Sequence, residues 1–272
     1  MAESAGSAGL YLRLVSQSVR AQLQYRWSFL LMAVGSLVTS GVEVLGIWAL
    51  FERFGLLGGQ WRLAEVAFLY GLVNAAFALA EAAARGFDVF GTEFVRTGTF
   101  DRVLLRPRGT VLQIAGHELQ LHRVGRFLQG AAVLAWAIWV LPIDWQAWRV
   151  ALLLFAFAGA AAFFYALFIA QATLSFWTTE SLEIMNTLTY GGTETAQYPL
   201  AIYRPWFRRF FTYIVPLGCV IYFPSVAILG IEDPLGSTRV FQVLAPAAGF
   251  VFLAVAIMLW NAGIRRYTSS GS

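Results

Sequence analysis

Long apolar runs constrain this chain more than any other feature. Six windows are apolar over about 20 residues, the length an α-helix needs to cross a bilayer. They cover residues 27–50, 63–84, 124–141, 148–176, 211–230 and 240–264. Only 12% of the residues are charged, about half the share in a soluble protein. The sequence therefore predicts an all-α integral membrane protein with six transmembrane helices, forming one domain over residues 10–272.

The arginines predict the orientation of these spans. Six spans put both termini on one side, and that side receives fifteen of the nineteen basic residues, all of them arginine. The other side keeps Arg53, Arg62, Arg149 and Arg239. Positive charge favours the cytoplasmic side, so both termini and the long connections 85–123 and 177–210 are expected there. Lysine-free, arginine-rich usage is typical of a bacterial chain, which places it in the inner membrane.

The N-terminal segment is expected to lie on the membrane. Residues 1–9 have no positive or apolar signal-peptide region and are expected to be disordered. Leu12, Val15, Val19 and Leu23 recur at helical spacing. This pattern favours an interfacial amphipathic helix over residues 10–25, with a cytoplasmic extension of the first span as the alternative.

Several kinds of chemistry are excluded or disfavoured. Without lysine the chain cannot contain the phosphate-binding motif G-x-x-x-x-G-K-[ST]. Cys219 is the single cysteine, typical of a buried apolar residue. His117, Glu118 and His122 do not have the H-E-x-x-H spacing of zinc proteases. We therefore expect no catalytic residue, metal or cofactor in this chain.

Polar residues inside the apolar windows are candidates for a substrate path, because polar groups at membrane depth are costly and face the bundle interior. The alternative is a close helix–helix seam. Glu81 precedes Arg85 by four residues, which allows an ion pair. The substrate-path candidates are Ser36, Thr39, Ser40, Glu43, Asn74 and Gln171.

Prolines and glycines mark two irregular regions. Pro216 and Pro224 predict a fifth span that is either kinked or split with a re-entrant outer part. In residues 88–108, DVFGTEFVRTGTFDRVLLRPR, an amphipathic helix is expected up to Gly98 and a second from Phe100 until Pro107. Such a helical elbow at the inner membrane surface suits contact with a cytoplasmic motor protein, or with anionic lipid.

At this loop the sequence resembles the ABC-2-type transporter permeases, in particular bacterial six-span exporter subunits of multidrug type. The loop segment is GTFDRVLLRP at residues 98–107. Further matching segments are PLAIY at 199–203, VP at 215–216, YFP at 222–224, DPLG at 233–236, Trp260, GIRRY at 263–267 and SSG at 269–271. Together they cover about residues 10–271.

The resemblance implies the membrane half of an ATP-binding-cassette exporter that moves an amphipathic or lipid-like substrate out of the cytoplasm or inner leaflet. Two such halves, identical or similar, would work with two ATPase subunits that bind ATP and Mg. Membrane lipid is expected as a partner and nucleic acid is not. The loop would be a coupling helix, with residues 191–209 a candidate addition. The implied ATPase contact comprises Phe94, Val95, Arg96, Gly98, Thr99, Phe100, Asp101, Leu104, Leu105 and Arg106.

Two other functions fit the residues. A secondary carrier could couple to protons through Glu43 or Glu81, and a membrane-embedded enzyme of lipid metabolism would show the same composition. Neither requires an ATPase partner. The substrate itself has no recognisable motif.

Overall fold

The computed structural model describes residues 26–58, 60–117, 123–177 and 182–267. These residues are helical, with one isolated bridge between Leu57 and Trp61 and no strand. The amphipathic helix expected over residues 10–25 lies outside them. The longer helices are α2 (Arg26–Phe54), α3 (Leu63–Ala83), α7 (Val124–Val140), α8 (Ala147–Leu174), α9 (Leu182–Ala196) and α14 (Ala247–Ile264). The shorter ones are α4 (Arg85–Asp88), η1 (Phe90–Val95), α5 (Phe100–Leu104), α6 (Thr110–Ala115), η3 (Leu200–Ile202), α10 (Pro205–Arg209), η4 (Phe210–Ile214), α11 (Leu217–Val220), α12 (Tyr222–Leu229) and α13 (Arg239–Leu244).

Four helices of the described chain are long and apolar enough to cross a membrane, namely α2, α3, α8 and α14. A fifth candidate is the bent pair Pro205–Ile214 and Leu217–Leu229. Helix α7 is apolar but has 17 residues, the lower limit for a span. The multi-pass membrane character expected from the sequence is therefore confirmed, while the count of six stays a prediction.

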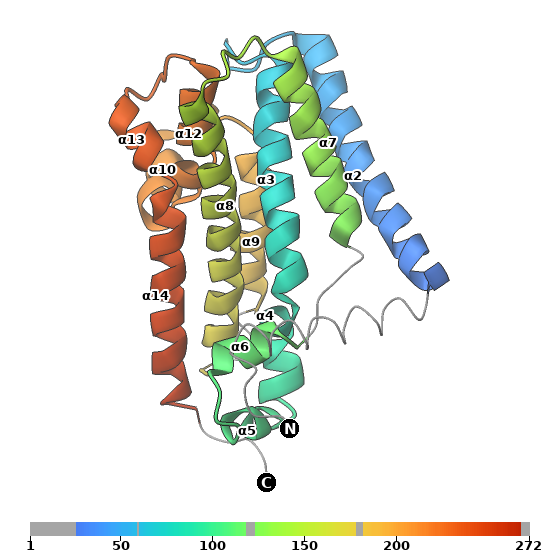
Figure 1. Cartoon of the computed structure of the whole chain (residues 1–272), viewed down its shortest axis with the longest axis vertical. Helices are drawn as coiled ribbons and strands as arrows, with labels where there is room; N and C mark the ends of the chain where they lie inside the picture. The colour runs from blue at the N-terminus through green and yellow to red at the C-terminus, as the bar shows by residue number, and fades with distance from the viewer. Residues whose placement is uncertain (1–25, 59, 118–122, 178–181, 268–272) are drawn as a thin grey trace.

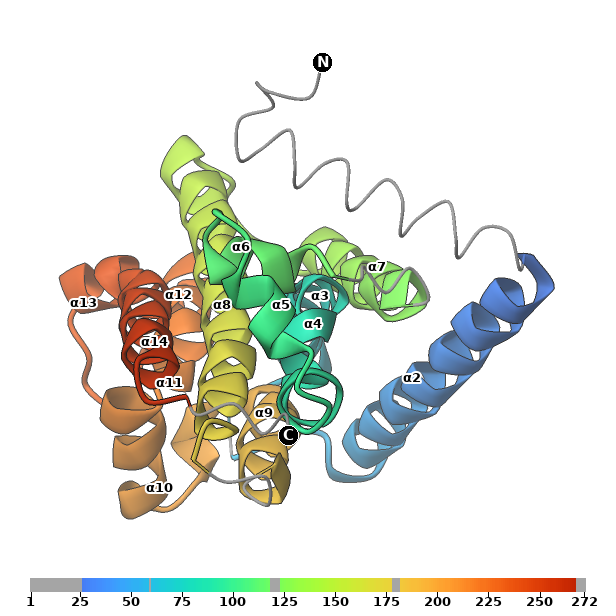
Figure 2. The ribbon, with the colours of Figure 1, turned by 90° about the horizontal axis from the view of Figure 1, so that it is seen from below.

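The helices form a bundle around α3, which packs against α7, α8 and α9 (Figure 1). Most of α3 is buried, including Phe68 and Phe77. Helix α14 packs along α8. Helix α2 contacts the bundle through Ile47 and Phe51 and leans away from it towards its N-terminus (Figures 1 and 2). Its apolar side chains, such as Leu31 and Val42, are largely exposed, as expected for a surface that faces lipid or another chain.

Glycine permits a close crossing of α8 and α14. A Cβ atom at Gly249 of α14 would lie 2.0 Å from the carbonyl oxygen of Gly159 on α8. Small residues allow such backbone approach in membrane helices, where van der Waals packing replaces the hydrophobic effect as the driving force. The α8–α14 contact therefore depends on the absence of a side chain at Gly249.

The fifth predicted span is split. The pair α10–η4 and α11–α12 bends by 73° around Val215 and Pro216, which selects the split form over the simple kink. Both ends of the pair lie at one end of the bundle (Figure 1). Just before the pair, Ile202 lies against Gly58 of the α2–α3 connection, and just after it a Cβ atom added to Gly230 would lie 3.7 Å from the Arg149 side chain at the start of α8. The segment therefore returns to the end from which it enters.

This geometry corrects the expected position of residues 177–210. They were expected to stay at the cytoplasmic end, but α9 runs back along α3 and α8, and Ile202 reaches the opposite end. Arg208 and Arg209 share a pocket with Pro234 of the last connection, which was expected on the other side of the membrane. The hydropathy pattern misses this because α9 carries many polar residues. Residues 200–209 therefore lie away from the elbow and are removed from the expected ATPase contact.

Candidate functional site

The first candidate region is the elbow formed by η1 and α5, at the end of the bundle remote from the α2–α3 connection and from α13 (Figure 1). Helix η1 has π-helical hydrogen bonding and ends before Gly98, whose φ of 69° is left-handed. Glycine adopts this conformation without the strain that a Cβ atom would cause. The hydroxyl of Thr99 donates to the carbonyl of Glu93 at 2.7 Å. The chain therefore reverses sharply between the two short helices.

Aromatic rings fix the elbow to the ends of α8 and α14. The Phe90 ring lies 4.8 Å from Trp260 of α14 and 5.2 Å from Phe176 just after α8. Phe100 packs edge-on against Phe90 at 5.0 Å and Tyr267 at 5.1 Å. The Trp260 indole also donates to the Thr110 hydroxyl at 3.0 Å. These contacts pack the elbow directly against the ends of α8 and α14.

The elbow residues that the resemblance implied for ATPase contact divide into two groups. Phe94 is 8% exposed and Phe100 is fully buried, so both hold the elbow in place. Leu105 is 85% exposed and Leu104 is 40% exposed. Arg96 and Arg106 are also exposed, while Val95, Gly98, Thr99 and Asp101 are partly exposed. The surface available to a partner is therefore an apolar tip at Leu105 with arginines around it.

A second candidate region is a belt of polar side chains between α2, α3, α7 and α9. Near the middle of α3, the Tyr70 hydroxyl donates to Glu43 of α2 at 3.2 Å and accepts from Gln129 of α7 at 3.0 Å. This contact joins α2 to the bundle. It accounts for Glu43, which was a substrate-path candidate, through a hydrogen bond to a neighbouring helix.

Arg126 places a positive charge inside this belt. Its guanidinium donates to the side-chain amide oxygen of Asn74, Oδ1, at 3.0 and 3.1 Å and lies 4.9 Å from the centre of the Phe77 ring. Asn74 is fully buried near the middle of α3. Charges at this depth are costly and are associated with transport pathways. Arg126 is a candidate that the sequence reasoning missed, because it was assigned to the cytoplasmic surface.

Glu81 is held by groups from two other helices. Its carboxylate pairs with Arg123 at 3.0 Å and accepts a hydrogen bond from Tyr190 of α9 at 3.1 Å. Arg85 pairs with Asp88 at 3.0 Å, so the spacing-based pairing of Glu81 with Arg85 is wrong. The reason is tertiary: the start of α7 brings Arg123 to the same face of α3.

The other substrate-path candidates lie apart from the belt. Thr39 donates to the Gly35 carbonyl of its own helix at 3.0 Å. Gln171 is buried in α8, and no hydrogen bond joins it to the belt within the described chain. The side chains of Ser36 and Ser40 fall outside the described part. The structure therefore brings Glu43 and Asn74 into one region and leaves Thr39 and Gln171 elsewhere.

Helix α9 contributes an unexpected polar surface. Thr189, Thr193 and Gln197 are buried against the bundle, while Glu194 is exposed on another face. The only sequence signal is that residues 186–197 are polar between apolar neighbours. An exposed carboxylate on a helix inside an apolar bundle indicates a neighbouring protein surface or an aqueous path.

The histidine and glutamate cluster considered for metal binding lies partly within the described chain. Of the histidine and glutamate cluster, His117 is described, and its Nε2 lies 3.6 Å from Glu93. Glu118 and His122 lie outside the described residues. Among the residues that can be searched, no group of three or more potential metal ligands occurs.

Apolar crossing helices, a polar belt within them and a rigid elbow at one end define a multi-pass membrane protein of the transporter class. A family model described as "ABC-2 family transporter protein" matches residues 37–271. The chain therefore belongs to the ABC-2 transporter family, whose members are membrane components that work with an ATPase partner. No curated protein and no solved structure matches the chain.

Proposed function

We propose that this chain is the permease half of an ATP-binding-cassette exporter, driven by a separate ATPase subunit that docks on the elbow. The observation that carries the proposal is the exposed Leu105 tip on an elbow whose rings are packed onto α8 and α14. Arginine is enriched among the residues that dominate protein–protein binding, and Arg96 and Arg106 are exposed on the same elbow as Leu105. Movement of the docked ATPase would shift both helices through this packing.

The proposed crossing pattern has six passes, formed by α2, α3, α7, α8, α9 and α14. It differs from the pattern expected from hydropathy, because α9 with residues 197–202 replaces residues 211–230 as the fifth pass. The bent pair is then re-entrant from the far end. In this pattern most arginines still lie on the side of the elbow. The elbow and both termini are therefore cytoplasmic in the inner membrane of a bacterium.

The proposed substrate path runs along the polar belt and the exposed face of α9. A second permease half, identical or similar, would cover this face and shield Glu194 and Arg126 from lipid. Water-filled cavities between such halves accommodate charged groups that lipid does not. An amphipathic or lipid-like substrate suits a path that has apolar helices on one side and this belt on the other.

Purification tests the proposal. An affinity-tagged chain isolated from native membranes should bring down an ATP-hydrolysing subunit. Leu105→Asp should abolish that association, while Leu244→Asp, an exposed leucine on α13 at the far end, should not affect it. Phe94→Asp is unsuitable as a test, because Phe94 is buried and its loss would disturb the elbow itself.

The same preparation addresses the secondary carrier. If the purified chain alone transports in vesicles with a proton gradient and without an ATPase, the ATPase-driven proposal is wrong. Glu81 is already engaged by Arg123 and Tyr190, so Glu43→Gln is then the variant that should stop transport. A chain that instead consumes lipid, with no transport, would indicate the membrane enzyme.

A further inference from the structure

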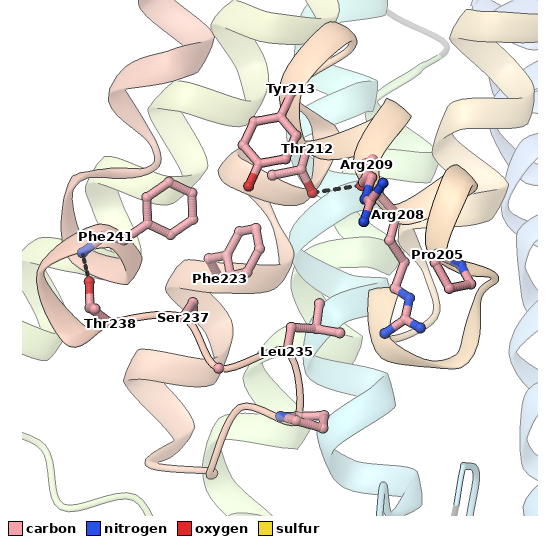
Figure 3. A pocket seen from close by; sticks show the side chains of 12 residues that line it. Pro205, Arg208, Arg209, Thr212, Tyr213, Phe223, Leu235, Ser237, Thr238 and Phe241 are labelled. Atoms are coloured by element: carbon pink, nitrogen blue, oxygen red, sulfur yellow. Dashed lines mark hydrogen bonds between the residues drawn. The ribbon is translucent and has the colours of Figure 1, made fainter.

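A cavity of about 620 Å³ lies at the far end of the bundle, between the bent pair and the connection from α12 to α13. This volume is in the range of small-molecule sites. Figure 3 shows the arginines on one side of the cavity and Ser237, Thr238 and Phe241 on the other. Its lining residues are Pro205, Arg208, Arg209, Thr212, Tyr213, Phe223, Pro234, Leu235, Gly236, Ser237, Thr238 and Phe241.

The charged lining of this cavity is entirely positive. Within the described chain, neither Arg208 nor Arg209 forms an ion pair with a carboxylate. The Nε atom of Arg208 is buried and has no hydrogen-bond partner there. A buried unpartnered donor on a charged group is costly unless a ligand satisfies it. The guanidinium of Arg208 therefore has unmet capacity for an anion.

Asp233, which precedes the lining residue Pro234, does not serve as the counter-ion. Asp233 accepts from the Tyr222 hydroxyl at 2.8 Å and from the backbone N–H groups of Leu235 and Ser237, both at 3.1 Å, and also from the Ser237 hydroxyl. These donors occupy its oxygens and fold the connection into a tight turn. The Asp233 carboxylate therefore stabilises the turn that forms this wall of the cavity.

The hydroxyl groups of the lining leave donors for a ligand. Ser237 is committed, since its hydroxyl donates to Asp233 and accepts from Gln242 at 3.0 Å. Thr238 accepts from the Phe241 backbone N–H at 3.3 Å, which leaves its O–H proton available. Tyr213, also in the lining, is 78% exposed. The cavity thus combines two guanidinium groups and a hydroxyl donor, a set that matches phosphate oxygens.

The surroundings are those of a membrane interface. Trp206 is 65% exposed and Ile214 is 66% exposed, on the same bent pair that carries the arginines. Exposed tryptophan and tyrosine are enriched at the level of lipid headgroups. Phe223 and Phe241 form an apolar wall across the cavity from the arginines, with ring centres 4.9 Å apart (Figure 3). An anion with an attached apolar chain would contact both walls.

We propose that this cavity binds a phosphate-bearing anion, through Arg208, Arg209 and Thr238. Phosphate groups at this position come from two sources, the headgroup of an anionic lipid or free phosphate. The site is independent of the elbow and of ATPase docking, so it stands or falls separately from the proposed transport function.

Binding to the purified full chain in neutral detergent micelles tests the proposal. One arm uses a fluorescent phosphatidylglycerol, and the other uses inorganic phosphate measured by calorimetry without lipid. Arg208→Gln and Arg209→Gln should each weaken binding by at least about tenfold, as expected for the loss of one charged hydrogen bond. Arg208→Lys should retain part of the affinity. Arg204→Gln, an exposed arginine of the same segment outside the lining, is the matched control.

The outcomes separate the sources and can overturn the site. Arginine-dependent binding of phosphatidylglycerol alone assigns a lipid headgroup, and arginine-dependent binding of inorganic phosphate assigns phosphate itself. Near-ultraviolet circular dichroism checks that each variant is folded, and Arg209→Gln, on an exposed residue, serves if Arg208→Gln does not fold. If both ligands bind equally well to folded Arg209→Gln and wild type, or if Arg204→Gln loses as much affinity, the proposal is wrong.

Discussion

Replacing Phe100 by alanine should loosen the elbow without unfolding the bundle. The Phe100 ring is fully buried, with ring centres 5.0 Å from Phe90, 5.6 Å from Phe176 and 5.1 Å from Tyr267. Deleting a buried phenylalanine ring costs about 3–5 kcal/mol. At about 1.4 kcal/mol for each factor of ten, local opening of the elbow should become at least on the order of 100-fold more frequent.

Hydrogen exchange measures this opening directly. The backbone amides of Arg102 and Leu105 donate to Thr99 and Asp101 at 3.2 Å, so they exchange only when α5 opens. Where closing is faster than exchange, the rate follows the population of the open state. Leu105→Ala is the control, because that side chain is 85% exposed. A Phe100→Ala change below tenfold, or an equal loss of protection in α3, would refute the anchoring role of the rings.

Other perturbations test the packing. Gly249→Ala should lower the thermal midpoint of the purified chain, because its Cβ atom would overlap the Gly159 carbonyl. The expected cost is about 1–3 kcal/mol. Gly191→Ala is the control, since the nearest atom to its Cβ is 3.9 Å away, and it should leave the midpoint unchanged or slightly raise it. Asn74→Leu removes the acceptor of the Arg126 guanidinium and should lower the free energy of unfolding by about 2–3 kcal/mol, measured by denaturation in mild detergent. Asn74→Asp keeps an acceptor and should destabilise the chain less. Equal midpoints for both variants would contradict the pairing. Cys219 is 5% exposed, so a maleimide should label it only after denaturation, and rapid labelling of the native chain would show that the α11 region is packed differently.

Hydropathy predicted the apolar helices but did not predict α9. The runs at 63–84 and 148–176 match α3 and α8 closely, because continuous apolar residues have few alternatives to a buried helix. Helix α9 was assigned to a loop, since its threonines and Glu194 resemble a solvated segment. It is placed in the bundle by tertiary contacts such as that between Tyr190 and Glu81, while Thr193 and Thr195 donate to carbonyl groups of their own helix. No window of local sequence contains that information.

The elbow shows the same limit in the placement of side chains. The turn at Gly98 follows from local chemistry, and the structure has left-handed backbone there. Phe100 points towards Trp260 and Phe176, which are distant in sequence, and Phe94 packs against Phe90 and His117. Sequence reasoning therefore grouped anchoring and exposed residues together. The polar belt was recognised in part through Glu43 and Asn74, while its arginine, Arg126, was placed at the surface.

Site-specific cross-linking at the elbow tests the central claim most directly. A photoreactive amino acid replaces Leu105 in the tagged chain, and in a parallel preparation it replaces Leu244 at the far end. After irradiation of intact cells, we expect one cross-linked product between position 105 and an ATP-binding subunit, and none from position 244. Cross-links from position 105 to lipid alone, or equal products from both positions, would contradict the claim that the elbow docks an ATPase.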